Sequence, residues 1–218
     1  MFFNELGETI NTAAMEAQEQ EFASKYIQED DVVLELGARY GTVTVRIQSR
    51  LRAKHLHVAV DPDPLVADVL RKNLERHQSL ATVFQGIVSK TPGTVEQDGY
   101  GTLVRLQTEA DAGCCASTDI QSLEATLGAK FTALVADCEG CLGPFFKDFP
   151  DFLSQLRLVM LETDPGYNQT DYEEVHAELR KRGFVEVDHV GWQFVYVRKS
   201  DATVESADQS EKQNGTGV

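Results

Sequence analysis

The sequence predicts an α/β fold with a doubly wound, mostly parallel sheet that ends in an antiparallel hairpin. Short runs of β-branched and apolar residues alternate along the chain with stretches in which apolar residues recur every three or four positions. Strands and helices that alternate in this way, with short joins, are typical of a parallel sheet covered by helices on both faces. The length of 218 residues fits one such domain with an appendage.

Five short apolar runs are expected to form the parallel strands. They cover residues 32–36, 57–60, 82–84, 131–136 and 156–161. Four of these runs lead directly into a glycine or an acid, namely Gly37, Asp61, Asp137 and Glu162. In doubly wound sheets ligands bind outside the carboxyl ends of the strands, so these four residues are expected to border one crevice.

Capping residues indicate where the helices begin and end. Asp63-Pro64 predicts a helix start after the second strand, since aspartate is a good N-cap and proline suits the first helical position. Capping-box patterns that begin at Thr118 and Thr170 predict two later helix starts. Gly183 is expected to end the last helix in the left-handed conformation. The antiparallel hairpin is expected at residues 184–187 and 193–197.

Three segments are expected along the chain. Residues 1–28 are rich in Glu, Gln and Ala, with apolar residues loosely at helical spacing, and are predicted to be an N-terminal helical segment. Residues 29–199 hold the α/β domain, in which a glycine-rich insert at 89–116 carries one further expected strand, 102–106. Residues 200–218 are small, polar and acidic, which predicts a disordered tail.

The charge balance excludes some partners. Twenty Lys and Arg oppose 35 Asp and Glu, which gives a net charge of −15. Proteins that hold nucleic acid neutralise its phosphates with Lys and Arg, so binding to duplex nucleic acid or to an anionic membrane is not expected. No Lys or Arg precedes Lys25, and no uncharged apolar run approaches roughly 18 residues. These observations predict a cytoplasmic protein, in which the four cysteines are expected to be reduced thiols.

A loop with two glycines joins the first strand to the next helix, at residues 35–41 (ELGARYG). Gly37 and Gly41 allow the backbone to turn tightly and to approach a ligand closely. The dinucleotide fingerprint G-x-G-x-x-G needs a further glycine where Arg39 stands, and an acid at Glu35 would repel a pyrophosphate. The loop therefore favours a ligand with positive charge, although a simple strand-to-helix turn would use the same glycines.

Asp61, at the end of the second strand, is a candidate for binding a nucleoside. A carboxylate in this place can accept hydrogen bonds from both hydroxyls of a ribose, as in dinucleotide-binding folds. The alternative is that Asp61-Pro62 is only a turn before a helix. Because Asp63 is the better helix cap, Asp61 remains available for a ligand.

Asp137 and Glu139 follow the fourth strand. If the strand continues, side chains two residues apart lie on the same side of the pleat. Paired carboxylates here could position a nucleophile, accept its proton or hold a divalent cation. The alternative is a solvated strand end without a chemical role.

Together these motifs resemble the FkbM family of S-adenosylmethionine-dependent methyltransferases. The resemblance extends over about residues 32–198 and is carried by 34–41 (LELGARYG), 60–62 (VDP), 117–123 (STDIQSL), 137–140 (DCEG) and the ending at 179–197. The family typically shows D-V-E-G where this chain has DCEG. Cys138 therefore departs from the pattern, and the insert at 89–116 has no counterpart in it.

The resemblance implies a class I methyltransferase (Rossmann-like) fold, S-adenosylmethionine as cofactor, and O-methylation of a hydroxyl on a sugar or other small molecule. Asp137 and Glu139 are then expected to be catalytic and to face the acceptor, and no metal is expected. The expected cofactor-binding residues are Glu35, Gly37, Ala38 and Gly41 at the methionine end, Asp61 and Pro62 at the ribose, and Gln85, Gly86 and Ile87 at the adenine.

Other hypotheses stay open at this point. The chain could be a non-catalytic protein of the same fold that binds S-adenosylmethionine, or a nicotinamide-dependent reductase. Glu162 could complete a metal site with Asp137. A four-thiolate zinc site is less favoured because adjacent cysteines ligate one ion poorly; it would use Cys114, Cys115, Cys138 and Cys141.

Overall fold

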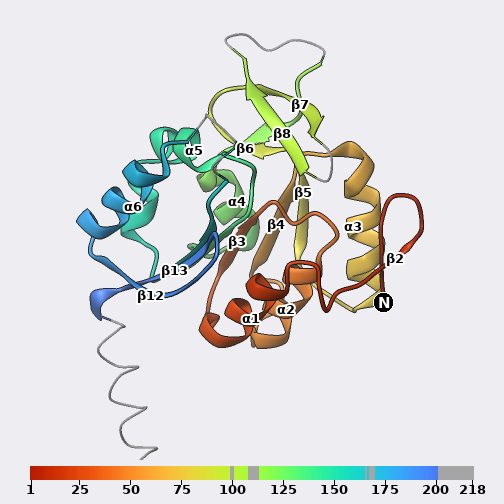
Figure 1. Ribbon diagram of the computed structural model, residues 1–218, viewed down its shortest axis with the longest axis horizontal. Coiled ribbons are helices and arrows are strands. Elements are labelled where there is room, and N and C mark those ends of the chain that lie inside the picture. The colour runs from red at the N-terminus through yellow and green to blue at the C-terminus, as the bar shows by residue number, and fades with distance from the viewer. Residues whose placement is uncertain (99–100, 108–112, 165, 167–169, 201–218) are drawn as a thin grey trace, which may run out of the picture.

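A seven-stranded sheet forms the centre of the molecule, with the strand order β12-β13-β11-β10-β3-β4-β5. The computed structural model describes residues 1–98, 101–107, 113–164, 166 and 170–200. The sheet strands are β3 (Val33–Leu36), β4 (His57–Asp61), β5 (Thr82–Gln85), β10 (Ala133–Ala136), β11 (Leu158–Glu162), β12 (Phe184–Val190) and β13 (Gln193–Arg198). β3, β4, β5, β10 and β11 run parallel, whereas β13 is antiparallel to both β11 and β12. The predicted doubly wound sheet with its antiparallel C-terminal hairpin is confirmed (Figure 1).

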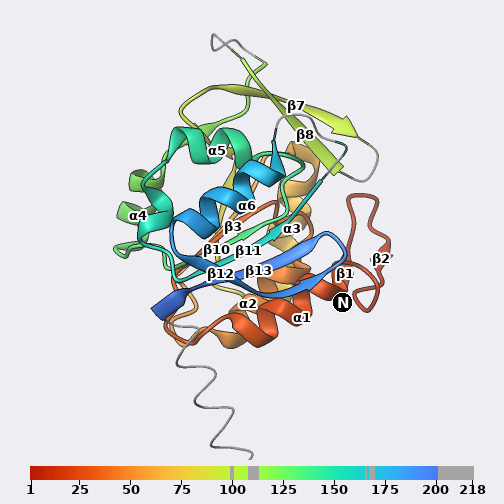
Figure 2. The ribbon, with the colours of Figure 1, turned by 60° about the vertical axis from the view of Figure 1, so that its left-hand side comes forward.

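Helices cover both faces of this sheet. They are α1 (Ala17–Tyr26), α2 (Thr42–Arg50), α3 (Pro64–Arg76), α4 (Ile120–Leu127), α5 (Leu142–Asp148) and α6 (Tyr172–Lys181), and a short 3-10 turn, η1, spans Phe152–Ser154. Alternate residues of β3 separate the two cores, because side chains on a strand point to opposite faces. Leu34 packs in the core that includes α5 and α6, and Val33 packs in the core that includes α1 and α2. Figure 2 shows α1 and α2 on the side opposite α4, α5 and α6.

The register brings the carboxyl ends of the central strands to one level. Leu36 at the end of β3 is paired with Ala136 of β10 on one side and with Val60 of β4 on the other. The residues that follow these three, including Gly37 and Asp137, therefore gather at one edge of the sheet.

The N-terminal segment is only partly helical, so the expectation of a helical segment over residues 1–28 was wrong for its first half. β1 (Phe2–Phe3) and β2 (Thr9–Ile10) form a small antiparallel pair before α1 begins. The side chain of Asn4 accepts hydrogen bonds from the backbone N–H groups of Leu6 and Glu8, and Gly7 has a φ of 78°. This side-chain-stabilised turn competes with helix formation.

Two of the expected helix caps are shifted by one residue. Asp119 caps α4 and Asp171 caps α6, each by accepting a backbone N–H bond with its side chain. Thr118 lies instead in a short strand, and the hydroxyl of Thr170 donates to the carbonyl oxygen of Gly140. Aspartate takes the cap in both cases because the threonine is already engaged by neighbouring backbone. Asp63 caps α3 as expected, with Pro64 at the first helical position.

The insert at 89–116 contributes a hairpin outside the sheet. β7 (Gly93–Asp98) and β8 (Gly101–Leu106) pair in antiparallel fashion, which confirms the strand expected at 102–106. At its base, β6 (Ile87–Val88) pairs in parallel with β9 (Ser117–Thr118). The hairpin stands over the carboxyl edge of the central strands (Figure 1). The expected tail beyond Ser200 lies outside the described residues.

Within the described part of the chain, no helix combines the length and the apolar character that a membrane crossing requires.

Candidate functional site

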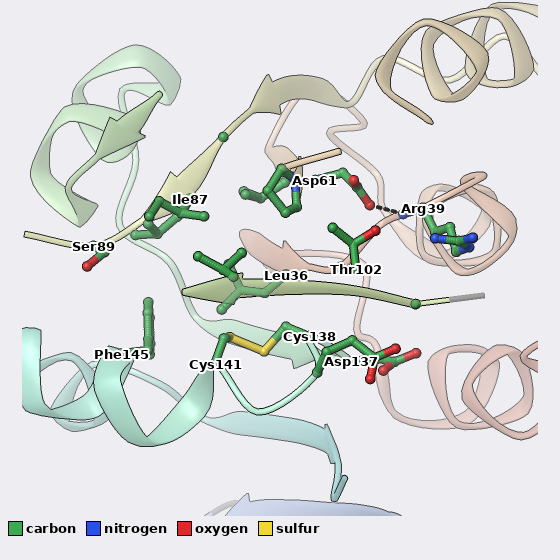
Figure 3. A pocket seen from close by; sticks show the side chains of 18 of the residues that line it. Leu36, Arg39, Asp61, Ile87, Ser89, Thr102, Asp137, Cys138, Cys141 and Phe145 are labelled. Atoms are coloured by element: carbon green, nitrogen blue, oxygen red, sulfur yellow. Dashed lines mark hydrogen bonds between the residues drawn. A yellow bond between two sulfur atoms is a disulfide. The ribbon is translucent and has the colours of Figure 1, made fainter. Parts of the chain in front are cut away.

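A pocket opens between the carboxyl edge of the sheet and the β7–β8 hairpin, at the place predicted from the strand ends. About 920 Å³ of space lies between the lining residues, part of it open to solvent. In Figure 3, Ile87 and Phe145 lie toward one end of the pocket, and Arg39, Thr102 and Asp137 lie toward the other. One end is therefore apolar and the other is polar and mainly acidic.

Seven of the expected site residues line this pocket and four do not. Those that line it are Gly37, Asp61, Pro62, Gly86, Ile87, Asp137 and Glu139. Those outside it are Glu35, Ala38, Gly41 and Gln85.

Asp61 is fixed at the pocket wall by backbone groups. Its two carboxylate oxygens accept hydrogen bonds from the backbone N–H groups of Arg39, at 2.7 Å, and Asp63, at 2.9 Å (Figure 3). Burial raises the pKa of Asp61 to about 6. Because each carboxylate oxygen has a second lone pair, the held group can still accept hydrogen bonds from two neighbouring hydroxyls of a ligand.

Gly37 occupies a position that only glycine fits. Its φ is 87°, and a Cβ atom built there would lie 1.6 Å from the carbonyl oxygen of Asp137. Gly41 also has a positive φ, but a Cβ there would meet Leu70 and Leu74 of α3. The first glycine thus allows two strand ends to meet at the pocket, whereas the second allows helix packing behind it.

Glu35 does not reach the pocket, which corrects its assignment to the methionine end. Leu36 faces the pocket, so its neighbour Glu35 points to the other face of β3. Its carboxylate accepts a hydrogen bond from Thr44, at 2.7 Å, and lies 3.0 Å from Nε2 of His57. The same oxygen, Oε2, makes both contacts, and Glu35, Thr44 and His57 are all buried, so Glu35 supports the loop from behind.

Of the three residues predicted to border the adenine, Gly86 and Ile87 line the pocket, whereas Gln85 is exposed and does not. Gly86 has a φ of 154°, and a Cβ there would lie 2.2 Å from the carbonyl oxygen of Ala116. The close approach of Ala116, the residue before β9, therefore fixes this wall of the pocket.

Asp137 and Glu139 would share one side of the pleat only if the strand continued, and it does not. β10 ends at Ala136, and Glu139 adopts a φ of 51°. Both side chains line the pocket, but the Glu139 carboxylate lies against Gly101 of the hairpin. The turn after the strand thus separates the surroundings of the two carboxylates.

Asp137 belongs to a cluster of three carboxylates. One oxygen each of Glu19, Asp137 and Glu162 lies within 4.8 Å of the others, and the amide of Gln193 donates to Glu19. Burial and the charge of Glu162 raise the pKa of Asp137 well above its usual value. Burial, with the charge of Glu19, raises the pKa of Glu162 to about 7. The cluster can retain a proton near neutral pH, and its oxygens are the donor type that divalent cations take.

Sequence reasoning missed Glu19 and Glu16, which come from the N-terminal segment. Glu19 lies on α1 and Glu16, which lines the pocket, precedes this helix and accepts a hydrogen bond from Thr42. Tyr40 in the glycine-containing loop donates to Glu5. No pattern separates these acids from the other acids and amides in the same stretch. Only the tertiary packing of α1 reveals them.

Cys138 and Cys141 form a disulfide, so the expectation of four reduced thiols was wrong for this pair. The C-x-x-C spacing across the turn after β10 brings the two Cα atoms to 5.4 Å, which lies within the range a disulfide requires. This bond also excludes a four-thiolate zinc site in this structure. Cys114 and Cys115 are not disulfide-bonded.

The arrangement was compared with known proteins. The precorrin-6y C5,15-methyltransferase from Geobacter metallireducens matches with a TM-score of 0.53 at 11% identity, over 88% of this chain and 94% of that one. A protein of the NADB-Rossmann superfamily from Streptococcus agalactiae matches with a TM-score of 0.50 at 10% identity, over 83% of this chain and 68% of that one. No protein-family model and no curated sequence matches the chain.

The strand order and these structural matches define the class: the chain has the Rossmann-like fold of the class I methyltransferases. The comparisons do not confirm the resemblance to the FkbM family, which stays a prediction.

Proposed function

We propose that this protein is an S-adenosylmethionine-dependent methyltransferase that methylates a hydroxyl on a sugar or another small molecule. The observation that carries the proposal is the Asp61 carboxylate, held by two backbone N–H groups at the wall of a pocket with one apolar and one acidic end. A nucleoside with an apolar base at one end and a cationic sulfonium and ammonium at the other matches this distribution. A nicotinamide dinucleotide fits less well, since its pyrophosphate would meet the acidic end.

In this proposal each part of the pocket has one task. Asp61 accepts the ribose hydroxyls, and the wall around Pro62 and Ile87 encloses the adenine. Gly37 lets the ends of β3 and β10 meet beside Asp137, and the methionine part lies against this junction. Gln85, Ala38, Gly41 and Glu35 act on the cofactor at most through the backbone that they support.

The reaction is an in-line displacement in which the acceptor oxygen attacks the methyl carbon and the sulfur leaves. Holding oxygen, carbon and sulfur in line can supply up to roughly 7–11 kcal/mol of the barrier. Asp137 borders both the pocket and the carboxylate cluster, so it is placed to orient the acceptor hydroxyl and to pass its proton toward Glu162. Glu139, against Gly101, closes the opposite side.

Binding is tested by calorimetric titration of S-adenosylmethionine, S-adenosylhomocysteine and NAD⁺ into the wild type and Asp61→Ala. We expect micromolar binding of the first two ligands to the wild type and loss of at least tenfold in the variant. Asp68→Ala is the matched control, because Asp68 is an exposed aspartate on α3. Tight binding of NAD⁺ alone would overturn the proposal.

Catalysis is tested with Asp137→Asn, and Asp151→Asn serves as an exposed control. We expect the first variant to lose most of its turnover with a panel of sugar and small-molecule hydroxyls while binding S-adenosylhomocysteine nearly as well as the wild type. An unchanged turnover number would remove Asp137 from the mechanism. Cofactor binding without transfer to any acceptor would favour the alternative, a non-catalytic protein that binds S-adenosylmethionine.

A further inference from the structure

We propose that Cys138 and Cys141 form a reversible thiol–disulfide site in the wall of the pocket, opened by a dithiol reductant, and that its state controls ligand binding there. The inference rests on the proposed function for the identity of the ligand. The existence of the reducible site does not depend on it.

The disulfide lies where a change in its state reshapes the pocket. Both cysteines line the pocket, and both are half-buried. Figure 3 shows the sulfur–sulfur bond between the apolar end, near Phe145, and the acidic end, near Asp137. Cys138 is bonded directly to Asp137 in the chain, and Cys141 directly precedes α5.

The bond does little to hold the fold together. It closes a loop between residues only three positions apart, and the stabilisation a cross-link gives through the unfolded chain grows with loop length. The segment on either side is already anchored, because β10 pairs on both edges and Leu142 and Phe145 are buried in the core. A disulfide that contributes little to folding and lies in a pocket is better explained by a role in the pocket.

The bond does hold an unfavourable backbone conformation. Glu139 has a φ of 51°, and a non-glycine residue in this left-handed region keeps it only where its surroundings impose it. The disulfide constrains the turn that contains Glu139. The hydroxyl of Thr170 fixes the next residues, by donating to the carbonyl of Gly140 and accepting from the N–H of Gly143. The backbone N–H groups of Glu139 and Gly140 also donate to the carboxylate of Asp164, so opening the disulfide removes one of several constraints on this turn.

A change in the backbone conformation of Glu139 would also move its side chain, which contacts the β7–β8 hairpin. Its carboxylate lies so close to Gly101 that a Cβ atom there would be 2.1 Å from Oε1. Gly101 and Thr102 also line the pocket, and Thr102 donates to the side chain of Asp63 at 3.1 Å. A shift of Glu139 therefore changes the position of the hairpin relative to the bound ligand.

The chemical step is thiol–disulfide exchange. A thiolate of the reductant attacks one cysteine sulfur, the bond between the cysteines breaks, and the other cysteine leaves as a thiolate that takes up a proton. The second thiol of the reductant then displaces the first cysteine and closes the reductant's own disulfide. Two electrons pass to the cysteine pair. The cytoplasmic location proposed from the sequence fits this reading, because disulfides in that compartment are mostly catalytic or redox-sensing.

The redox state is measured by alkylation with iodoacetamide and intact mass, before and after treatment with dithiothreitol under native conditions. We expect two alkylated cysteines before reduction, Cys114 and Cys115, and four after it. Four alkylated cysteines in the untreated protein, or a pair that resists reduction in the folded state, would overturn the proposal.

Control of the pocket is measured by titrating S-adenosylhomocysteine into the oxidised and reduced protein, and by hydrogen–deuterium exchange of residues 101–106. We expect at least fivefold weaker binding and faster exchange in the reduced state. C138S/C141S is expected to match the reduced protein and to ignore dithiothreitol, whereas C114S/C115S is expected to keep the response. Equal affinity together with equal exchange would overturn the proposal. If neither state binds the ligand, the proposed function fails, and the exchange rates alone decide for or against the redox effect.

Discussion

At the residue scale, Gly37 matters both for stability and for the pocket, because it lets two strand ends pack together at the pocket wall. Its Cβ position lies 1.6 Å from a backbone oxygen, whereas a Cβ at Gly128, which has a similar positive φ, meets nothing within 4 Å. Gly128→Ala should therefore lose only roughly 1–2 kcal/mol of unfolding free energy, from the left-handed backbone. Gly37→Ala should lose at least about 2 kcal/mol more, because two strand ends must move apart. Urea unfolding of both variants measures this, and equal losses would contradict the close packing.

Glu162 should make the unfolding free energy of the protein depend on pH. Its pKa is raised from 4.5 to about 7, so the folded state binds the proton more tightly than the unfolded chain. The group therefore stabilises the fold most at low pH, and this stability is lost as pH rises from about 4.5 through 7. Glu162→Gln removes the titration while its amide can still donate to Glu19. We expect the unfolding free energy of this variant to rise relative to that of the wild type between pH 5 and pH 8.5, by on the order of 1–3 kcal/mol after allowance for solvent screening at this half-buried group. Thermal unfolding at a series of pH values measures this difference.

The control is Glu21→Gln, which replaces an exposed acid on α1 outside the carboxylate cluster. A constant difference for Glu162→Gln across the same range would show that the carboxylate cluster does not share a proton in the folded state.

At the element scale, the sequence predicted every strand of the central sheet, because buried parallel strands leave compact apolar runs between helices. The sequence also predicted that Asp61 borders the pocket, because its place at a strand end is enough to bring it to the carboxyl edge of the sheet. The prediction failed where the direction of a side chain depends on packing. Glu35 belongs to the same motif as Gly37, but the alternation of β3 sends its side chain to the other face. Glu19 was missed because only the docking of α1 brings it to Asp137.

The contact between the β7–β8 hairpin and the turn after β10 should determine how long the pocket retains its ligand. Gly101→Ala places a methyl group against the Glu139 carboxylate without a left-handed backbone to strain. We expect S-adenosylhomocysteine to dissociate roughly five- to tenfold faster, with unchanged thermal stability, since the hairpin lies outside the sheet. Arg105→Gln is the control, because it breaks only an exposed ion pair with Glu96 on the same hairpin. Equal dissociation rates for the two variants would show that the hairpin does not retain the ligand.

At the scale of the whole molecule, charge should select the acceptor. The chain carries a net charge of −15. Glu16 and Asp137 line one end of the pocket, and Glu19 and Glu162 lie beside Asp137. An acidic pocket in an acidic protein attracts cations at long range and repels anions, and salt screens both effects. Among sugars that offer the same hydroxyls, kcat/KM should therefore rank an amino sugar above the neutral sugar and the neutral sugar above its phosphate. The spread should shrink when sodium chloride is raised from 20 to 500 mM. Faster methylation of the phosphate at low salt would mean that a local basic group, and not the overall field, receives the acceptor.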